Sequence, residues 1–368
     1  MKNALLLIFA CCCFTFARAQ QYSIIAHVTG FPDGTKFYLN DVDIDTDIDS
    51  ALIRNNSFSL KGTLGESPRS LWVSTVFNNK TYYFSLLMGN EKVSVKGDIK
   101  DFPFDLKITG SKTQDGHNKL ISLIKEGYKQ RNPLVEEYFA LKGDSARAKA
   151  VQTIIAKLDS VDKATRMNYV RQNLNSYSGL NALFDLKDDF PADTMRLFYK
   201  SINPEFRNSR FGKRIDTYIK VGKILEEGDA FYDFAALDKE GNKHQLSDIK
   251  GKYILLDFSA TYCGPCIASL PELTEVSRKY ANQLTVITFS GDGGKETWLR
   301  GLNRDQPQWL SLWDGKGSYG ETAIKYGVSG YPSFVLINPE RKIVSKWIGY
   351  DKGIVLKKIE SFLNLKSR

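Results

Sequence analysis

Two cysteines separated by two residues offer the clearest chemistry in this chain, in the motif Cys263-Gly264-Pro265-Cys266. They follow an apolar run at 253–258, which is typical of a buried strand, and they precede a helical pattern. Two thiols with this spacing at the start of a helix can form and break a disulfide reversibly. The positive end of the helix dipole favours a thiolate at Cys263, which is the predicted nucleophile. Cys266 is expected to be more buried and to resolve the mixed disulfide.

Asp257, inside the same apolar run, is the candidate proton acceptor. A carboxylate among apolar residues is costly to ionise, so its pKa should be raised. It could then accept the proton of Cys266 when that thiol must attack. The competing interpretation is an acid at a strand end in contact with water.

The pair Tyr331-Pro332 stands directly before a predicted strand at 333–338. A cis bond at this proline would expose the backbone of Tyr331 for pairing with an extended substrate. A proline at this point can also simply begin the strand. The expected substrate-binding residues are Tyr262, Gly264, Pro265, Tyr331 and Pro332.

The N-terminus has the pattern of a secretory signal peptide over residues 1–19. Lys2 is followed by an apolar segment at 4–16 and by the small-x-small sequence Ala17-Arg18-Ala19. We therefore expect an exported, periplasmic protein. The alternative is a lipoprotein that associates with the membrane through Cys11, Cys12 or Cys13, although the residues before them make a poor lipidation motif. Apolar runs after the signal peptide are too short to span a membrane.

The cysteine count restricts the chemistry further. Three of the five cysteines lie in the predicted signal peptide, which leaves Cys263 and Cys266. This pair cannot provide a structural disulfide framework or a four-cysteine zinc site. The three histidines are scattered along the chain without ligand spacing. We expect neither a metal nor another cofactor.

The formal net charge of +9 falls to +7 when the signal peptide is removed. No basic stretch interleaved with aromatic residues stands out, so a nucleic-acid partner is not expected.

The composition changes twice along the chain and predicts three parts after the signal peptide. Residues 20–111 show short strands with turn signals and predict an antiparallel β-sandwich or barrel. Residues 112–228 predict a helical region with breaks at prolines 133, 191 and 204. Residues 229–368 alternate strands and helices, which indicates an α/β domain.

Acidic residues alternate with other residues at 41–49. Calcium binding is one interpretation, but the glycine of an EF-hand loop is missing, because Thr46 stands in its place. In an extended segment the five acids share one face, so we expect a solvated edge or loop that resists aggregation.

The stretch Leu-Leu-Asp-Phe-Ser-Ala-Thr-Tyr-Cys-Gly-Pro-Cys at 255–266 resembles the thioredoxin superfamily, specifically the exported TlpA/ResA-type thiol–disulfide oxidoreductases. Pro271, Tyr331-Pro332 and Gly349 match the helix kink, the cis-proline loop and a late glycine of that family. The resemblance covers 229–368 and implies a central mixed sheet flanked by helices, with Pro332 beside Cys263. Residues 20–228 resemble, more loosely, the β-rich domain and helical linker that often precede such domains.

The resemblance implies an enzyme that reduces disulfides of exported proteins and is re-reduced by a membrane electron-transfer protein. Three departures from the family pattern matter, of which the mildest is Tyr262, where the family often has Trp before the first cysteine. Ser259 stands where many relatives have Trp, which affects the rim and its partner contacts. Thr288 stands where thioredoxin has a Lys that partners the buried acid, so Asp257 is expected to stay protonated to a higher pH or to rely on water.

Two other functions compete with disulfide reduction. The first is a thiol peroxidase, but a peroxiredoxin usually has Thr three residues before its reactive cysteine, and Ala260 stands here. The second is a binding protein in which residues 20–228 hold the partner and the thioredoxin-like domain is accessory. The intact cysteine pair argues against it.

Overall fold

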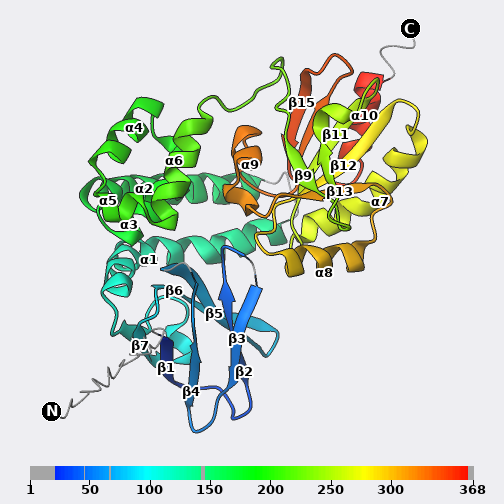
Figure 1. Cartoon of the computed structure of the whole chain (residues 1–368). Coiled ribbons are helices and arrows are strands. Elements are labelled where there is room, and N and C mark those ends of the chain that lie inside the picture. The colour runs from blue at the N-terminus through cyan, green and yellow to red at the C-terminus, as the bar shows by residue number, and fades with distance from the viewer. Residues whose placement is uncertain (1–20, 45, 66–67, 142–145, 364–368) are drawn as a thin grey trace, which may run out of the picture.

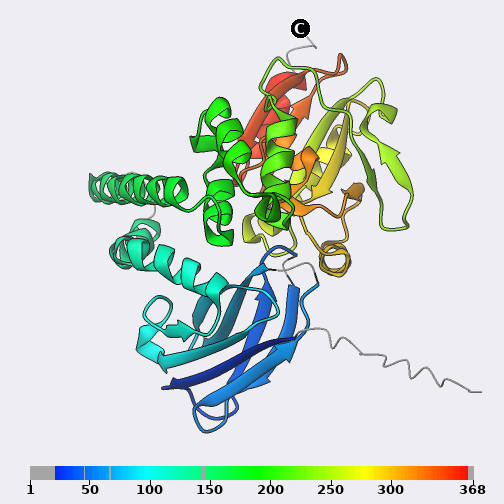
Figure 2. The same ribbon diagram turned by 60° about the vertical axis from the view of Figure 1, so that its left-hand side comes forward.

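The computed structural model describes residues 21–44, 46–65, 68–141 and 146–363. The predicted signal peptide, the cysteines at 11–13 and Asp45 lie outside the described residues. The described chain forms a β-sandwich, a helical part and an α/β part, in that order (Figures 1 and 2).

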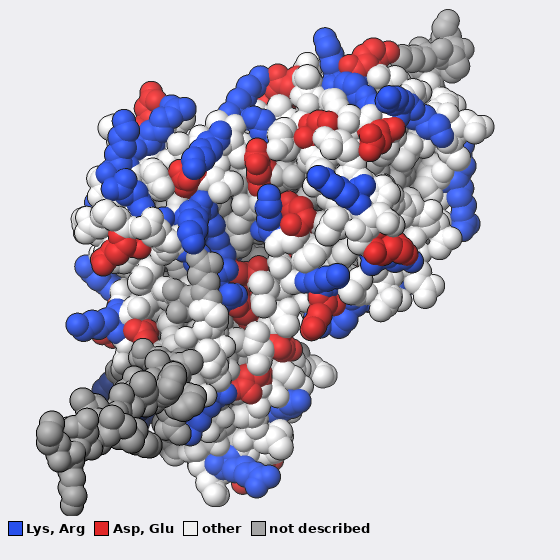
Figure 3. All heavy atoms as spheres, in the orientation of Figure 1, with Lys and Arg blue, Asp and Glu red and all other residues white. Residues whose placement is uncertain are grey.

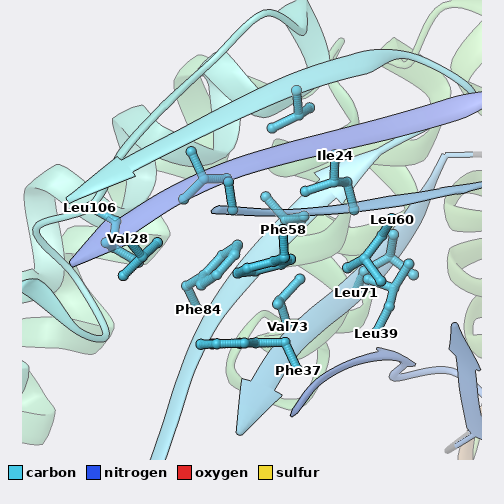
Figure 4. Close-up of a cluster of buried hydrophobic side chains, with 14 of the residues drawn as sticks. Ile24, Val28, Phe37, Leu39, Phe58, Leu60, Leu71, Val73, Phe84 and Leu106 are labelled. Carbon is cyan, nitrogen blue, oxygen red and sulfur yellow. The ribbon is translucent and has the colours of Figure 1, made fainter. Parts of the chain in front are cut away.

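The N-terminal part is a sandwich of two four-stranded sheets within the described residues, with strand orders β4-β1-β7-β8 and β3-β2-β5-β6. The predicted β-rich fold is confirmed, with one difference: β1 and β7 pair in parallel, while the other pairings are antiparallel. Alternate side chains point between the sheets and form one apolar core (Figure 4). The strands are β1 (Tyr22–Thr29), β2 (Lys36–Asp41), β3 (Thr46–Leu52), β4 (Ser57–Gly62), β5 (Arg69–Phe77), β6 (Lys80–Met88), β7 (Lys92–Asp98) and β8 (Lys107–Thr109).

Two of the alternating acids are buried, so the prediction of one solvated acidic face is wrong for them. Asp41 and Asp43 are 1% and 8% exposed. Asp41 pairs with Arg69, and Asp43 pairs with two arginines of the helical part. A register irregularity between Leu39 and Asn40 interrupts the regular alternation. Buried charges are tolerated when they are paired, and the pairing residues lie far away in the sequence.

The helical part contains two long helices and four shorter ones among its described residues. Helix α1 continues through Pro133, so the predicted break is wrong there. The packing of α1 along α2 compensates for the hydrogen bond that a proline removes. Helix α6 was not predicted; it buries Phe211 and Ile215 in the core of this part. The helices are α1 (Lys112–Ala140), α2 (Ala146–Gln172), α3 (Tyr177–Asp185), α4 (Ala192–Ser201), α5 (Pro204–Arg207) and α6 (Arg210–Val221).

The C-terminal part has a seven-stranded mixed sheet in the order β10-β9-β13-β12-β11-β14-β15. β11, β12 and β13 are parallel, and β14 runs antiparallel to β11. The strands are β9 (Ala235–Leu237), β10 (Lys243–Gln245), β11 (Tyr253–Ser259), β12 (Leu284–Ser290), β13 (Leu310–Trp313), β14 (Ser333–Ile337) and β15 (Ile343–Ile348). The helices are α7 (Gly264–Lys279), α8 (Lys295–Asp305), α9 (Glu321–Lys325) and α10 (Ile354–Leu363).

The central strand β11 is apolar on both faces because both faces are covered. Leu255 packs in a core with side chains of α7 and α10. Ile254 and Leu256 pack in a second core that includes Tyr326, just after α9. This burial explains the dense apolar run in the sequence and confirms the predicted mixed sheet flanked by helices.

The chain enters the C-terminal part before the segment predicted as its start. The Leu225 amide donates to Lys325 O at 2.9 Å, and the Gly228 amide donates to Ile343 O at 2.8 Å. Leu225 also packs in the core beside β11. Among the described helices, none combines the length and apolar character that crossing a membrane requires.

Candidate active site

Cys263 and Cys266 are joined by a disulfide at the start of α7. Their sulfurs are 2.00 Å apart and their Cα atoms 5.2 Å apart. Cys263 is the N-cap residue, and the Cys266 amide donates to its sulfur at 3.1 Å. Cys266 is buried, with 4% exposed, while Cys263 is partly exposed. In the reduced protein the same amide and the helix dipole would stabilise a thiolate on Cys263.

The surface around the cysteine pair is open and partly apolar. Tyr262 is 59% exposed, and Gly264 and Pro265 are also exposed. Ile267, on the first turn of α7, adds an exposed apolar side chain. An exposed rim of this kind gives a large substrate something to contact beside the reactive sulfur.

Strand pairing brings Pro332 to the end of the sheet that carries the cysteines. Phe258 of β11 pairs with Ser333 of β14, so Pro332 lies next to the carboxyl end of β11. The Tyr331-Pro332 bond is cis. Pro332 itself is buried, and the Tyr331 hydroxyl is buried against Gly291. The side chain of Tyr331 is therefore not part of the open rim.

Asp257 is buried in β11 and has one hydrogen-bond partner among the described residues. The Thr288 hydroxyl donates to Asp257 Oδ2 at 2.8 Å, while Oδ1 has no partner. Burial raises the pKa of Asp257 to about 7, against the lowering effect of the Thr288 hydrogen bond. The direction is the one expected from the apolar run. A carboxyl group with this pKa can hold or release a proton near neutral pH.

A small cavity of about 40 Å³ lies beside Asp257 and reaches Leu270 on the second turn of α7. Asp257, Thr288, Ala260 and Leu270 line it, and Leu270 lies one helical turn after Cys266. The cavity has room for about one water molecule next to polar atoms. A water molecule at this position could exchange a proton with the Asp257 carboxyl group.

Trp309 extends the hydrogen bonding of Asp257 through Thr288. Its indole Nε1 donates to Thr288 Oγ1 at 2.9 Å. The Thr288 oxygen therefore accepts from Trp309, and its proton is directed to Asp257. The sequence singled out the position of Thr288, but it gave no sign that Trp309 would bond to it.

Asp292 anchors the loop before the cysteines and was missed by the sequence analysis. Its carboxylate accepts from the Thr261 amide at 3.0 Å and from the Thr261 hydroxyl at 2.8 Å. The Ser290 hydroxyl also donates to it at 2.7 Å. A signal was present, because Asp292 stands in a glycine-rich turn at the carboxyl end of the strand at 284–290. The parallel pairing of β11 and β12 brings that turn to the same sheet edge as the cysteines.

Tyr262 is itself held by a side chain of α8. Arg300 Nη2 donates to the Tyr262 hydroxyl at 2.9 Å and to Thr297 Oγ1 at 3.2 Å. The orientation of the rim therefore depends on α8 as well as on the cysteine loop.

No group of three or more potential metal ligands occurs among the residues that the structure describes. The basic and acidic side chains are interspersed on the face shown in Figure 3, so the positive net charge is not gathered into one patch there.

Two family models match separate segments of the chain. A family model described as thioredoxin-like matches residues 251–343, and a model described as a domain of unknown function (DUF4369) matches residues 22–116. The thiol-disulfide oxidoreductase ResA of Bacillus thuringiensis is 30% identical over 130 residues, which cover 35% of this chain and 73% of ResA. The thioredoxin-like protein YneN of Bacillus subtilis is 29% identical over 136 residues, which cover 36% of this chain and 78% of YneN.

Among solved structures, the thioredoxin domain of a thiol-disulfide oxidoreductase from Bacteroides vulgatus matches with 28% identity and a TM-score of 0.35, covering 38% of this chain and 99% of that domain.

Proposed function

Because the chain belongs to the ResA-type thiol–disulfide oxidoreductases with a thioredoxin-like domain, we propose that it reduces disulfides of exported proteins through Cys263 and Cys266. The observation that carries the proposal is the bonded cysteine pair at the N-terminus of α7, with one sulfur partly exposed and the other buried. This asymmetry suits a nucleophile that meets the substrate and a resolving thiol that does not.

The reaction proceeds by two exchanges between sulfur atoms. The Cys263 thiolate attacks one sulfur of the substrate disulfide; a mixed disulfide forms, and the other substrate sulfur leaves as a thiolate and takes up a proton. Cys266 then loses its proton and attacks the Cys263 sulfur, which releases the second substrate thiolate. The substrate gains two electrons, and the enzyme ends with the Cys263–Cys266 disulfide that the structure contains.

Asp257 is the proposed acceptor of the Cys266 proton. Its pKa of about 7 lets it be ionised when the enzyme starts and protonated after the transfer. The cavity beside Asp257, which reaches Leu270 one helical turn after Cys266, has room for a water molecule that would take part in this transfer.

Protein substrates would bind across the rim next to the reactive sulfur. Tyr262, Gly264 and Pro265 supply the exposed surface, and the backbone at Tyr331-Pro332 supplies an edge for an extended segment of the substrate. The buried hydroxyl of Tyr331 is consistent with a role for its backbone rather than its side chain.

Regeneration requires a dithiol donor, which we propose to be a membrane electron-transfer protein facing the periplasm. The Cys-Gly-Pro-Cys motif is shared with thioredoxin, whose potential is about −270 mV against about −120 mV for the oxidant DsbA. A difference of about 150 mV, or about 7 kcal/mol for two electrons, favours reduction of substrates. Export follows from the predicted signal peptide at 1–19, with lipid attachment at Cys11, Cys12 or Cys13 as the alternative.

The test is trapping with Cys266→Ser in the processed protein. Removing the resolving thiol should stall the first exchange, so that exported proteins accumulate as mixed disulfides with Cys263 and are released by dithiothreitol. The matched control is the double variant with Cys263→Ser, which should trap nothing. Equal recovery from both variants, or peroxide consumption without disulfide exchange by the wild type, would overturn the proposal.

A further inference from the structure

A buried carboxylate fastens the β-sandwich to both other parts of the molecule. The Asp43 side chain is 2% exposed, and its oxygens lie 2.8 Å from Arg210 Nη1 and 2.7 Å from Arg214 Nη2, both on α6. The Arg214 guanidinium carbon lies 3.5 Å from the ring centroid of Tyr319, in the C-terminal part. Because an unpaired buried charge is costly, these contacts keep the end of the sandwich between β2 and β3 in one place.

The same end of the sandwich touches the turn between β12 and α8. A methyl group added at Gly293 would lie 2.2 Å from the carbonyl oxygen of Asp43. One added at Gly294 would lie 3.2 Å from the carbonyl oxygen of Ile44. The two glycines therefore allow a direct approach of one backbone to the other. Figures 1 and 2 both place this end of the sandwich next to α8.

A line of hydrogen bonds leads from the sandwich to the rim of the cysteine site. The Thr46 hydroxyl donates to Ile44 O at 3.0 Å and lies 2.7 Å from Thr297 Oγ1. Either hydroxyl can donate in the bond between Thr46 and Thr297. Thr297 Oγ1 in turn accepts from Arg300, whose same nitrogen donates to the Tyr262 hydroxyl.

A second contact joins the same segment to the loop before Cys263. The Thr261 hydroxyl donates to Thr297 O at 3.1 Å and to the carboxylate of Asp292. The segment 291–297 therefore lies between the sandwich on one side and Thr261 and Tyr262 on the other. Thr261 and Tyr262 therefore bond to the region that contains Asp292, Thr297 and Arg300, and this region is itself bonded to the β-sandwich through Thr46.

We propose that the β-sandwich is a positioning element of the cysteine site, acting through Thr46 on Thr297, Arg300 and Tyr262. The inference rests on the proposed function, because Tyr262 is taken as part of the rim that protein substrates contact. The sandwich then determines how well the enzyme accepts large disulfide substrates, while the chemistry at the sulfurs stays with Cys263 and Cys266.

The experiment compares three variants of the full chain. Thr46→Val removes the hydroxyl that is hydrogen-bonded to Thr297, and Thr46→Ser keeps it. Thr35→Val is the matched control, because the Thr35 hydroxyl of the same sandwich bonds to Pro32 O at 2.8 Å, within its own turn. Two quantities are measured: amide hydrogen exchange at Thr261 and Cys263 in the oxidised protein, and kcat/KM with insulin and with dithiobis(nitrobenzoate).

Thr46→Val should raise exchange at Thr261 and Cys263 about fivefold, the ratio expected for the loss of one hydrogen bond. It should lower kcat/KM for insulin by a similar factor. It should leave kcat/KM for the small disulfide within about twofold, because a small substrate makes fewer contacts with the rim beyond the Cys263 sulfur. Thr46→Ser and Thr35→Val should match the wild type. Gly293→Ala, which separates the two backbones from the other side, should reproduce the Thr46→Val result.

The outcomes separate this inference from the proposed function. If Thr46→Val and Thr35→Val show the same exchange, or if both substrates lose rate equally, the positioning role is wrong. If the wild type reduces neither insulin nor the small disulfide, the proposed function fails, while the exchange data still decide whether the sandwich holds the loop.

Discussion

Asp257 combines two properties that oppose each other, namely full burial and a single hydrogen bond from Thr288. Burial penalises the ionised form, so the pKa of about 7 means that the folded protein binds this proton more tightly than the unfolded chain does. Ionising the buried Asp257 carboxyl lowers the free energy of unfolding of the protein. Its titration should therefore affect unfolding as well as turnover.

We predict that Asp257→Asn stabilises the oxidised protein at high pH. The unfolded carboxyl has its ordinary pKa near 4 and the folded one about 7, so the wild type loses stability as the pH rises through this interval. The variant cannot ionise and should be more stable by up to about 4 kcal/mol at pH 8, with no difference near pH 4. Urea unfolding at both pH values measures this. Asp351→Asn, which changes an exposed carboxylate, should leave the free energy of unfolding unchanged at both pH values.

Thr288 should determine the pH at which the enzyme works. Its hydroxyl lowers the pKa of Asp257, so Thr288→Val should raise that pKa above 7. Less of the carboxylate is then ionised at neutral pH, and the inflection in the pH dependence of disulfide reduction should move upward by about one unit. Thr288→Ser keeps the donor and should leave the inflection in place. If the pH dependence of disulfide reduction were unchanged in Thr288→Val, Asp257 would not take part in the rate-limiting proton transfer.

At the scale of elements, α7 is held to α10 by a buried carboxylate. Glu272 Oε2 accepts from the Gly353 amide at 2.9 Å, and its Oε1 accepts from the Leu356 amide at 2.6 Å. These amides belong to the N-terminal turn of α10, where a negative charge is favoured. The helix that carries the cysteines therefore also provides the cap of the last helix.

We predict that Glu272→Ala destabilises the protein by about 2–3 kcal/mol, because two amides of α10 lose their acceptors. Glu272→Gln keeps one acceptor and should cost about half as much. The midpoint of urea unfolding measures both, provided that the slope stays constant. Glu275→Ala, on the exposed side of α7, should change the free energy of unfolding by less than about 0.5 kcal/mol. If Glu272→Ala changed it as little as Glu275→Ala does, the capping role of Glu272 would be contradicted.

The elements around the cysteines could be predicted because their patterns are local and strong. The apolar run at 253–258 became β11, and the helical pattern after the cysteines became α7. The short strands β9 and β13 were missed, since three or four residues carry too little periodicity. Pro133 does not break α1 as its type predicts, because the packing of α1 against α2 outweighs the local effect of the proline.

The site was predictable to the same extent. Cys263, Cys266 and Asp257 stand in one short motif, so their grouping needed no fold. Asp292 and Arg300 join the site only through the pairing of β11 with β12 and the position of α8. Asp43 was misread as a surface acid because the arginines that pair with it belong to α6, a helix that the pattern did not reveal.

At the scale of the whole molecule, the contacts of Asp43 should make the three parts unfold together. Asp43→Ala leaves Arg210 and Arg214 buried without their carboxylate, and breaking such a pair costs about 3–5 kcal/mol. The sandwich should then separate from the rest. In a Trp72→Phe background, which removes the tryptophan of the sandwich, fluorescence reports the four tryptophans of the C-terminal part. Unfolding followed by circular dichroism, which reports all three parts, should then begin before unfolding followed by fluorescence.

Asp47→Ala is the matched control, because Asp47 belongs to the same alternating run and is exposed. It should cost less than about 0.5 kcal/mol and keep the two probes coincident. If Asp43→Ala behaves like Asp47→Ala, the buried charge does not hold the parts together. The end of the sandwich would then have to be held against α8 by the backbone contacts at Gly293 and Gly294 and by the Thr46–Thr297 bond alone.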